Sequence, residues 1–191
     1  MKKSLSAVWR WLHIYLSMVG FALLLFFSVT GITLNHTEWF EDMQTTVTLK
    51  GRMDTTILAG ETDRLAVAET LRKSHQVRGT VSSFEVDEEQ VTVSFAGPGY
   101  AADAFITRVD GAYEITETRT GIWGMMNDLH KGRDTGTAWR WLIDASAVLM
   151  ILISLTGMFM LFYLKRKRVA GLVVALAGLL VAWLMYAIWV P

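Results

Sequence analysis

The sequence contains no cysteine among its 191 residues. Disulfide bonds, thiolate metal sites, iron–sulfur clusters and covalently attached c-type haem are therefore excluded. The side chains left to bind a metal are methionine, the carboxylates and four histidines. Any metal chemistry in this chain must use those groups.

Two signals of nucleotide and nucleic-acid binding are also missing. No Gly-x-Gly-x-x-Gly motif follows an expected strand, so the sequence offers no Rossmann site for a nicotinamide or flavin nucleotide. The soluble part has no basic patch interleaved with aromatic residues, so we expect no nucleic acid partner. If the protein transfers electrons, its donor must be a separate cytoplasmic reductase or a membrane quinol.

Proline is scarce, and the charges balance. The chain has two prolines, and its 18 Lys and Arg residues match 18 Asp and Glu residues. Hydrophobic residues make up 52% of the chain and the mean hydropathy is +0.35, which indicates an integral membrane protein with one modest soluble part. Residues 35–138 hold 17 acidic and 10 basic side chains, a net charge of −7 that attracts cations.

Three long apolar runs predict membrane helices. The first, Ile14–Leu34, contains no charged residue, and the others are Trp139–Leu164 and Val169–Val190. Since about 20 apolar residues cross a bilayer as an α-helix, we predict three transmembrane helices. The first run is too long for a signal peptide and lacks a small-residue cleavage site, so we expect it to be retained.

Basic residues predict the orientation of these helices. Lys165, Arg166, Lys167 and Arg168 lie in the short connection between the second and third runs. Because short basic loops stay in the cytoplasm, the N-terminus is expected there, with residues 35–138 and Pro191 on the other side.

The soluble segment has the pattern of a small α+β domain. Helical spacing over Glu61–His75 places Leu65, Ala68 and Leu71 on one side. Asp110-Gly111 is a hairpin signal between the last two strands. One helix and about four strands bury little core alone, so we expect the sheet to lean on the membrane helices or on a second subunit. The predicted strands are Thr80–Val86, Gln90–Ala96, Ala102–Val109 and Tyr113–Arg119.

Two short elements occur once in each of the first two apolar runs. Trp9-Arg-Trp-Leu12 returns as Trp139-Arg-Trp-Leu142, and Ser28-Val-Thr-Gly31 returns as Ser154-Leu-Thr-Gly157. The spacing between the elements differs, which makes this weak evidence of a repeat. Small and hydroxylated residues let membrane helices approach, so we read the second element as a helix-packing motif.

Three of the four histidines lie at predicted membrane boundaries. His13 and His36 flank the first run and are 23 residues apart, roughly 35 Å along a helix axis. His130 precedes the second run on the same side as His36. These positions suit axial ligands of haem, although a boundary histidine is also often a simple interfacial residue. His75, in the soluble helix, is most simply a surface histidine.

Three boundary histidines cannot supply two axial ligands to each of two haem irons within one chain. His36 and His130 can clamp one b-type haem iron from adjacent helices. His13 then needs a non-histidine ligand, a partner chain's His13, or no haem on its side; we favour the pair of His13 residues across a dimer axis. Met125 and Met126 offer a thioether ligand, but packing is the simpler role for them.

The sequence resembles a known family over nearly all of its length to Leu164. AFITRVDGAYEITETR resembles the last hairpin of the PepSY domain. The stretch GIWGMMNDLHKGRDTGTAWRWLIDASAVLMILISLTGMFMLF resembles the helix that accompanies this domain in PepSY-associated transmembrane proteins, and the opening WRWLHIYLSMVG resembles their first helix. The implied fold is three transmembrane helices with a PepSY-like α+β domain between helices 1 and 2.

The resemblance also implies a function. Members of this family include inner-membrane haem reductases of ferric iron or ferric siderophores, and the short form with one PepSY unit is similar to a ferric reductase that assists ferrous iron uptake in Gram-negative bacteria. It implies haem b bound by His13, His36 and His130, a periplasmic PepSY-like domain, and a ferric iron or ferric chelate substrate. A separate importer would take the ferrous product, and a homodimer would restore a four-helix core.

Two other functions stay open at this level. The chain can be a non-enzymatic membrane-tethered PepSY module that binds or regulates a partner protein, or a haem protein of quinol oxidation or respiratory assembly. The expected segments are 1–36, the N-terminus and first membrane helix; 37–129, the PepSY-like domain; 130–164, the outer histidine and second membrane helix; 165–168, the basic loop; and 169–191, the third membrane helix.

Overall fold

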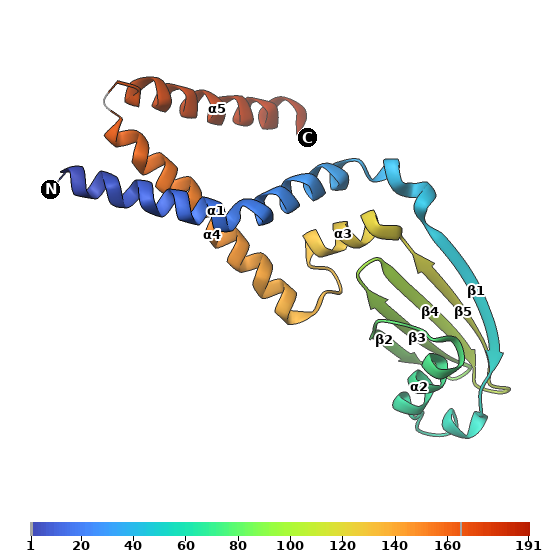
Figure 1. The fold of residues 1–191 in the computed structure, drawn as a ribbon. Coiled ribbons are helices and arrows are strands. Elements are labelled where there is room, and N and C mark those ends of the chain that lie inside the picture. The colour runs from blue at the N-terminus through green and yellow to red at the C-terminus, as the bar shows by residue number, and fades with distance from the viewer. Residues whose placement is uncertain (1, 165) are drawn as a thin grey trace. The chain divides into compact units, whose positions relative to one another are not determined.

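The computed structural model describes residues 2–164 and 166–191 (Figure 1). Lys165 of the predicted basic loop lies outside the described residues. In chain order the elements are α1 (Lys2–Asn35), η1 (Thr37–Met43), β1 (Thr45–Arg52), η2 (Thr55–Ile57), α2 (Arg64–His75), β2 (Thr80–Val86), β3 (Gln90–Gly97), β4 (Tyr100–Thr107), β5 (Ala112–Arg119), α3 (Gly121–Lys131), α4 (Gly136–Tyr163) and α5 (Arg168–Trp189).

Three of the helices are long and apolar enough to cross a membrane. They are α1, α4 and α5, whose candidate spans have mean hydropathies of 2.1, 2.3 and 2.3. Few of their side chains are buried, which is the pattern expected of helices whose apolar groups face lipid. The prediction of three membrane-length helices is confirmed.

The five strands form one antiparallel sheet in the order β1-β5-β4-β3-β2. Residues along β3 and β4 alternate between buried and more exposed positions, as expected when one face of a sheet is covered. The helix α2 begins after Asp63, whose carboxylate accepts a hydrogen bond from the backbone N–H of Ala66. This cap explains why the helix starts at Arg64 and not at the predicted Glu61.

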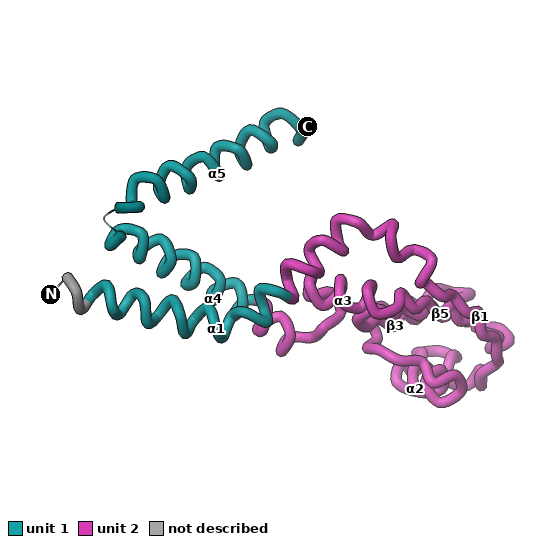
Figure 2. The backbone as a smooth tube through the Cα atoms, turned by 45° about the horizontal axis from the view of Figure 1, so that its top comes forward, with its two compact units in different colours: residues 1–25, 144–191 teal, residues 26–143 magenta. Residues whose placement is uncertain are grey.

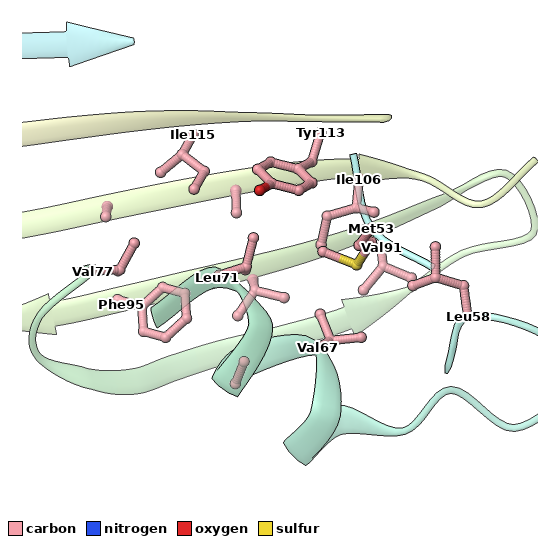
Figure 3. Close-up of a cluster of buried hydrophobic side chains, with 14 residues drawn as sticks. Met53, Leu58, Val67, Leu71, Val77, Val91, Phe95, Ile106, Tyr113 and Ile115 are labelled. Carbon is pink, nitrogen blue, oxygen red and sulfur yellow. The ribbon is translucent and has the colours of Figure 1, made fainter. Parts of the chain in front are cut away.

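The core of the domain lies between α2 and one face of the sheet, as Figure 3 shows. Val67, Ala68 and Leu71 of α2 are buried there. The expected core residue Leu65 is 72% exposed, because the buried face of α2 is centred on Val67, Ala68 and Leu71 and Leu65 lies roughly 115° around the helix from it. The other buried hydrophobic residues of the cluster are Met53, Leu58, Val77, Val91, Val93, Phe95, Ala102, Ala104, Ile106, Tyr113 and Ile115.

The predicted hairpin between the last two strands is confirmed. β4 and β5 pair up to Ile106 and Tyr113, and the turn carries Gly111 at φ +66°. A side chain at Gly111 would also overlap the backbone oxygen of Met53. Both the backbone angle and the space therefore require glycine here.

Two expectations about the domain need correction. The sheet has a fifth strand, β1, which pairs with β5 at one edge. The sheet also lies between α1 and α4, not between helices 1 and 2, because the short helices α2 and α3 occupy the same stretch of chain. The strand β1 was missed because it is mostly exposed and shows no hydrophobic alternation.

The described chain divides into two compact units (Figure 2). One contains residues 1–25 and 144–191, with the first part of α1, most of α4, and α5. The other contains residues 26–143, with the end of α1, the sheet, α2 and α3. The histidines are distributed over both, with His13 in the first unit and the others in the second.

Candidate functional site

His13 lies on α1 and packs against α4 within the first unit. Its Nδ1 atom is 3.1 Å from the backbone oxygen of Ile153 and 3.1 Å from Oγ1 of Thr156. A Cβ atom on Gly157 would lie 3.2 Å from Cε1 of His13, so the ring lies directly over this glycine. The half-buried imidazole is thus held through Nδ1 by the Thr156–Gly157 segment.

His130 lies near the end of α3 and packs against α1 within the second unit. Its Nδ1 atom is 2.6 Å from Oγ1 of Thr30. The edge of the ring contacts Phe27, with centroids 5.1 Å apart, and a Cβ atom on Gly31 would lie 3.8 Å from Cε1. This imidazole is also held through Nδ1, by the Thr30–Gly31 segment of α1.

Two polar contacts fix α3, and with it His130. One turn before the histidine, Asn127 accepts a hydrogen bond of 2.6 Å from the hydroxyl of Thr33 on α1. The next residue, Asp128, is buried and accepts hydrogen bonds from the backbone N–H of Gly99 at 2.9 Å and from Nε of Arg133 at 2.8 Å. α3 is therefore tied both to α1 and to the β3–β4 turn, which orients His130.

His36 follows the last residue of α1 and has a different environment. Its Nδ1 atom is 3.1 Å from Oε1 of Glu38, and its ring stacks on Trp39 at 4.1 Å with an angle of 4°. The pKa of the Glu38 carboxyl is lowered, first by its own backbone N–H and then by His36. The carboxylate is therefore ionised and suited to accept a proton-bearing Nδ1.

His36 and His130 lie in the same unit, but different residues surround them. His130 lies beside Gly31, and His36 comes five residues later, a rise of roughly 7.5 Å along a helix. Each ring has its own Nδ1 partner. Their joint binding of one iron stays a prediction.

The fourth histidine differs from the other three. His75 ends α2, and its Nε2 atom is 3.0 Å from the hydroxyl of Tyr113, which belongs to the sheet. The ring is half-buried, where the sequence suggested a surface residue. For the other three histidines, the hydrogen bonds of the described residues engage Nδ1 and leave Nε2 without a partner.

Two residues that hold the candidate ligands were missed from the sequence. Thr30 and Thr156 contact His130 and His13 respectively, and both belong to the repeated Ser-x-Thr-Gly element. The repeated Ser-x-Thr-Gly element was visible in the sequence, but its small residues indicated only helix packing. Nothing in the sequence indicated that its threonines contact histidines.

No cluster of three or more His, Asp or Glu side chains suited to a metal ion occurs in residues 2–164 and 166–191. A haem iron differs from such a site because the porphyrin supplies four ligands and the protein one or two. The backbone of Met125 lies against the β3–β4 turn, where a Cβ on Gly99 would be 2.8 Å from the Met125 Cβ, and the methionine is 36% exposed. Its role as a haem ligand stays a hypothesis.

Burial lowers the pKa of His130 below its ordinary value of 6.5, and the neighbouring Lys131 lowers it further. The unfolded chain then binds a proton at a higher pH than the folded chain does. The stability that this group contributes is complete above pH 6.5 and is lost as the pH falls from 6.5 through the folded pKa. A neutral imidazole is also the form that binds a metal.

We expect His130 in the ligand-free protein to titrate below pH 6.5. The measurement is a pH series of ¹⁵N-histidine NMR spectra of the detergent-purified protein, with His130→Gln used to assign the signal. A short histidine peptide in the same detergent serves as the reference. A midpoint at or above that of the peptide would contradict the expectation.

Comparison with protein-family models places the chain in one family. The model described as PepSY_TM-like matches residues 7–191. Comparisons with curated proteins and with solved structures find no match. The family match covers the membrane helices as well as the sheet, so the chain belongs to the PepSY_TM-like family.

Proposed function

We propose that the protein is a haem-b electron carrier that reduces ferric iron or ferric chelates on the periplasmic side of the membrane. The observation that carries this proposal is the shared state of His13, His36 and His130. Among the residues that the structure describes, each ring has a hydrogen-bond partner for Nδ1 and none for Nε2. Metal-binding histidines in proteins have this arrangement, because the second nitrogen donates to an oxygen that fixes the ring.

The residues present fit a haem group. Cysteine is absent, so attachment must be noncovalent, as in b-type haem. Neutral imidazoles are common axial ligands, and the lowered pKa of His130 keeps it neutral. The fourth histidine has its Nε2 beside Tyr113 and is not a candidate ligand.

The chain's own residues have defined roles in this proposal. His13 would hold one haem on the cytoplasmic side, and His130 would hold another on the periplasmic side, with His36 as the candidate second ligand. The haem supplies reversible one-electron chemistry when bound. Phe27 packs against His130 in a T-shaped arrangement, with ring centroids 5.1 Å apart.

The proposed location follows from the basic residues between α4 and α5. Arg166 and Lys167 lie in the connection between α4 and α5, and Arg168 begins α5; such a basic connection favours the cytoplasmic side. The protein would then lie in the bacterial inner membrane with its N-terminus in the cytoplasm and its PepSY-like domain in the periplasm. The acidic residues 35–138 would meet the ferric substrate outside.

The proposed partners follow from what one chain supplies. His13 is the only histidine of its unit, so a homodimer that pairs two His13 side chains supplies the second ligand. Electrons would come from a cytoplasmic reductase or a membrane quinol. The ferrous product would pass to a separate importer in the same membrane.

The test is an optical spectrum of the detergent-purified full-length protein, oxidised and then reduced. We expect a b-type spectrum whose reduced form is reoxidised when ferric citrate is added in the absence of oxygen. A colourless protein from haem-replete cells would contradict the proposal and favour a tethered binding module. A haem spectrum that ferric chelates leave reduced would indicate another electron-transfer role.

A further inference from the structure

His13 and His130 are held in closely similar ways in two separate places. His13 lies on the second Ser-x-Thr-Gly element, and His130 lies on the first. We propose that Thr30 and Thr156 are positioning residues that hold the two imidazoles with the proton on Nδ1. This inference rests on the proposed function and extends it to residues outside the ligand set.

The direction of the hydrogen bond at His130 follows from proton counting. The hydroxyl of Thr30 has one hydrogen, and its oxygen is 2.6 Å from the backbone oxygen of Phe26. A carbonyl oxygen only accepts, so the hydroxyl donates there. Thr30 must then accept from Nδ1–H of His130, and the lone pair of the neutral ring lies on Nε2.

The same reasoning applies to His13, with one addition. The hydroxyl of Thr156 is 2.8 Å from the backbone oxygen of Leu152, to which it donates. Nδ1 of His13 also lies 3.1 Å from the backbone oxygen of Ile153, which can only accept. His13 therefore has two acceptors for Nδ1–H, whereas His130 has Thr30 alone among the described residues.

The glycine next to the threonine makes room for the ring at His13 only. A Cβ on Gly157 would be 3.2 Å from the His13 ring, tighter than ordinary van der Waals contact, whereas a Cβ on Gly31 would be 3.8 Å from the His130 ring, which is ordinary contact. At both places the acceptor oxygen is the threonine's.

The tryptophan repeat provides an independent observation. Trp9 stacks on Phe159 with ring centroids 4.7 Å apart, and Trp139 makes an edge contact with Phe26 at 6.4 Å. The first tryptophan of each Trp-Arg-Trp-Leu copy therefore contacts a phenylalanine close to the Ser-x-Thr-Gly element of the other helix.

Threonine in a membrane helix often donates to the carbonyl one turn earlier, so that bond alone does not indicate a role. Ser154 supplies the matched control, because its hydroxyl donates to Met150 and has no described contact with a histidine. A threonine that served only the helix would behave in the same way. The distinguishing feature of Thr30 and Thr156 is the imidazole on the same oxygen.

The experiment compares Thr30→Val, Thr156→Val and Ser154→Ala in the full-length protein. Valine keeps the shape of threonine and removes the acceptor oxygen. Thr30→Ser keeps that oxygen and removes only the methyl group. The first readout is ¹⁵N NMR of the histidine side chains in ligand-free protein, which reports the tautomer without haem. The second is titration with haemin, which reports affinity.

We expect Thr30→Val to lose the Nδ1–H tautomer of His130 and to lower haem affinity about 10- to 100-fold, the range for loss of an outer-shell partner. Thr156→Val should have a smaller effect, because Ile153 still accepts from His13. Ser154→Ala and Thr30→Ser should resemble the parent.

An unchanged His130 tautomer in Thr30→Val would overturn the positioning role, and so would equal effects of Thr30→Val and Ser154→Ala. Failure of the proposed function looks different. In that case the parent binds no haem, while the tautomer of His130 still depends on Thr30.

Discussion

His130→Ala is expected to remove the outer haem and to lower its affinity by more than about 100-fold, since loss of an outer-shell partner alone costs about 10- to 100-fold. The open Nε2 of this ring is the group that we propose as the iron ligand. Reoxidation by ferric citrate should fall in proportion to the lost haem. The measurement is haem content per chain together with anaerobic reoxidation of the reduced protein.

His75→Ala is the matched control for this variant. It removes an imidazole of the same unit whose Nε2 is already engaged by Tyr113, so haem content should stay at the parent level. His36→Ala then tests the second ligand: a haem that remains bound but becomes five-coordinate places His36 opposite His130. Full haem content in His130→Ala would exclude it as a ligand.

His13→Ala is expected to stop electron transfer across the membrane while leaving the outer haem in place. His13 precedes and His36 follows the uncharged run Ile14–Leu34, and the 23 residues between them span roughly 35 Å along a helix, so one haem cannot serve both. The assay uses proteoliposomes with dithionite trapped inside and ferric chelate outside. We expect the rate of transmembrane ferric reduction to fall at least about tenfold. A loss of that size would show that the proposed haem on His13 is required.

Two further readings make this result specific. The variant should still show the spectrum of the haem held by His130, and external dithionite should still reduce it. Ser154→Ala, which alters the same helix pair without contacting His13, should transfer electrons at the parent rate. Undiminished transmembrane reduction by His13→Ala would contradict an inner haem on this residue.

Most of the regular structure was predictable because it follows local patterns. The predicted strand Thr80–Val86 has the observed bounds, and the hairpin at Gly111 was indicated by its Asp-Gly turn. The three apolar runs predicted α1, α4 and α5. The strand β1 was not predictable in this way, because it is a mostly exposed edge strand whose place depends on pairing with the distant β5.

The candidate site was predictable in part. The positions of His13, His36 and His130 at membrane boundaries singled them out as ligands, and that role stays a prediction. The surroundings of His13 and His130 were not predictable, since Thr30 lies 100 residues from His130 and Thr156 lies 143 residues from His13. The partner of His36 is local, because Glu38 lies two residues away. His75 was assigned to the surface because its partner Tyr113 belongs to a strand 38 residues away, and no local pattern indicates that contact.

By itself, the sequence determined the number of membrane-length helices, the acidic soluble domain between the first two apolar runs, and the absence of cysteine chemistry. These properties depend on composition and on periods of a few residues, which act locally. For His13 and His130, the tertiary structure alone decided which ring nitrogen has a hydrogen-bond partner. That choice depends on single oxygen atoms brought close by the packing of α1 against α4 in one unit and α3 against α1 in the other, and no local pattern encodes such contacts.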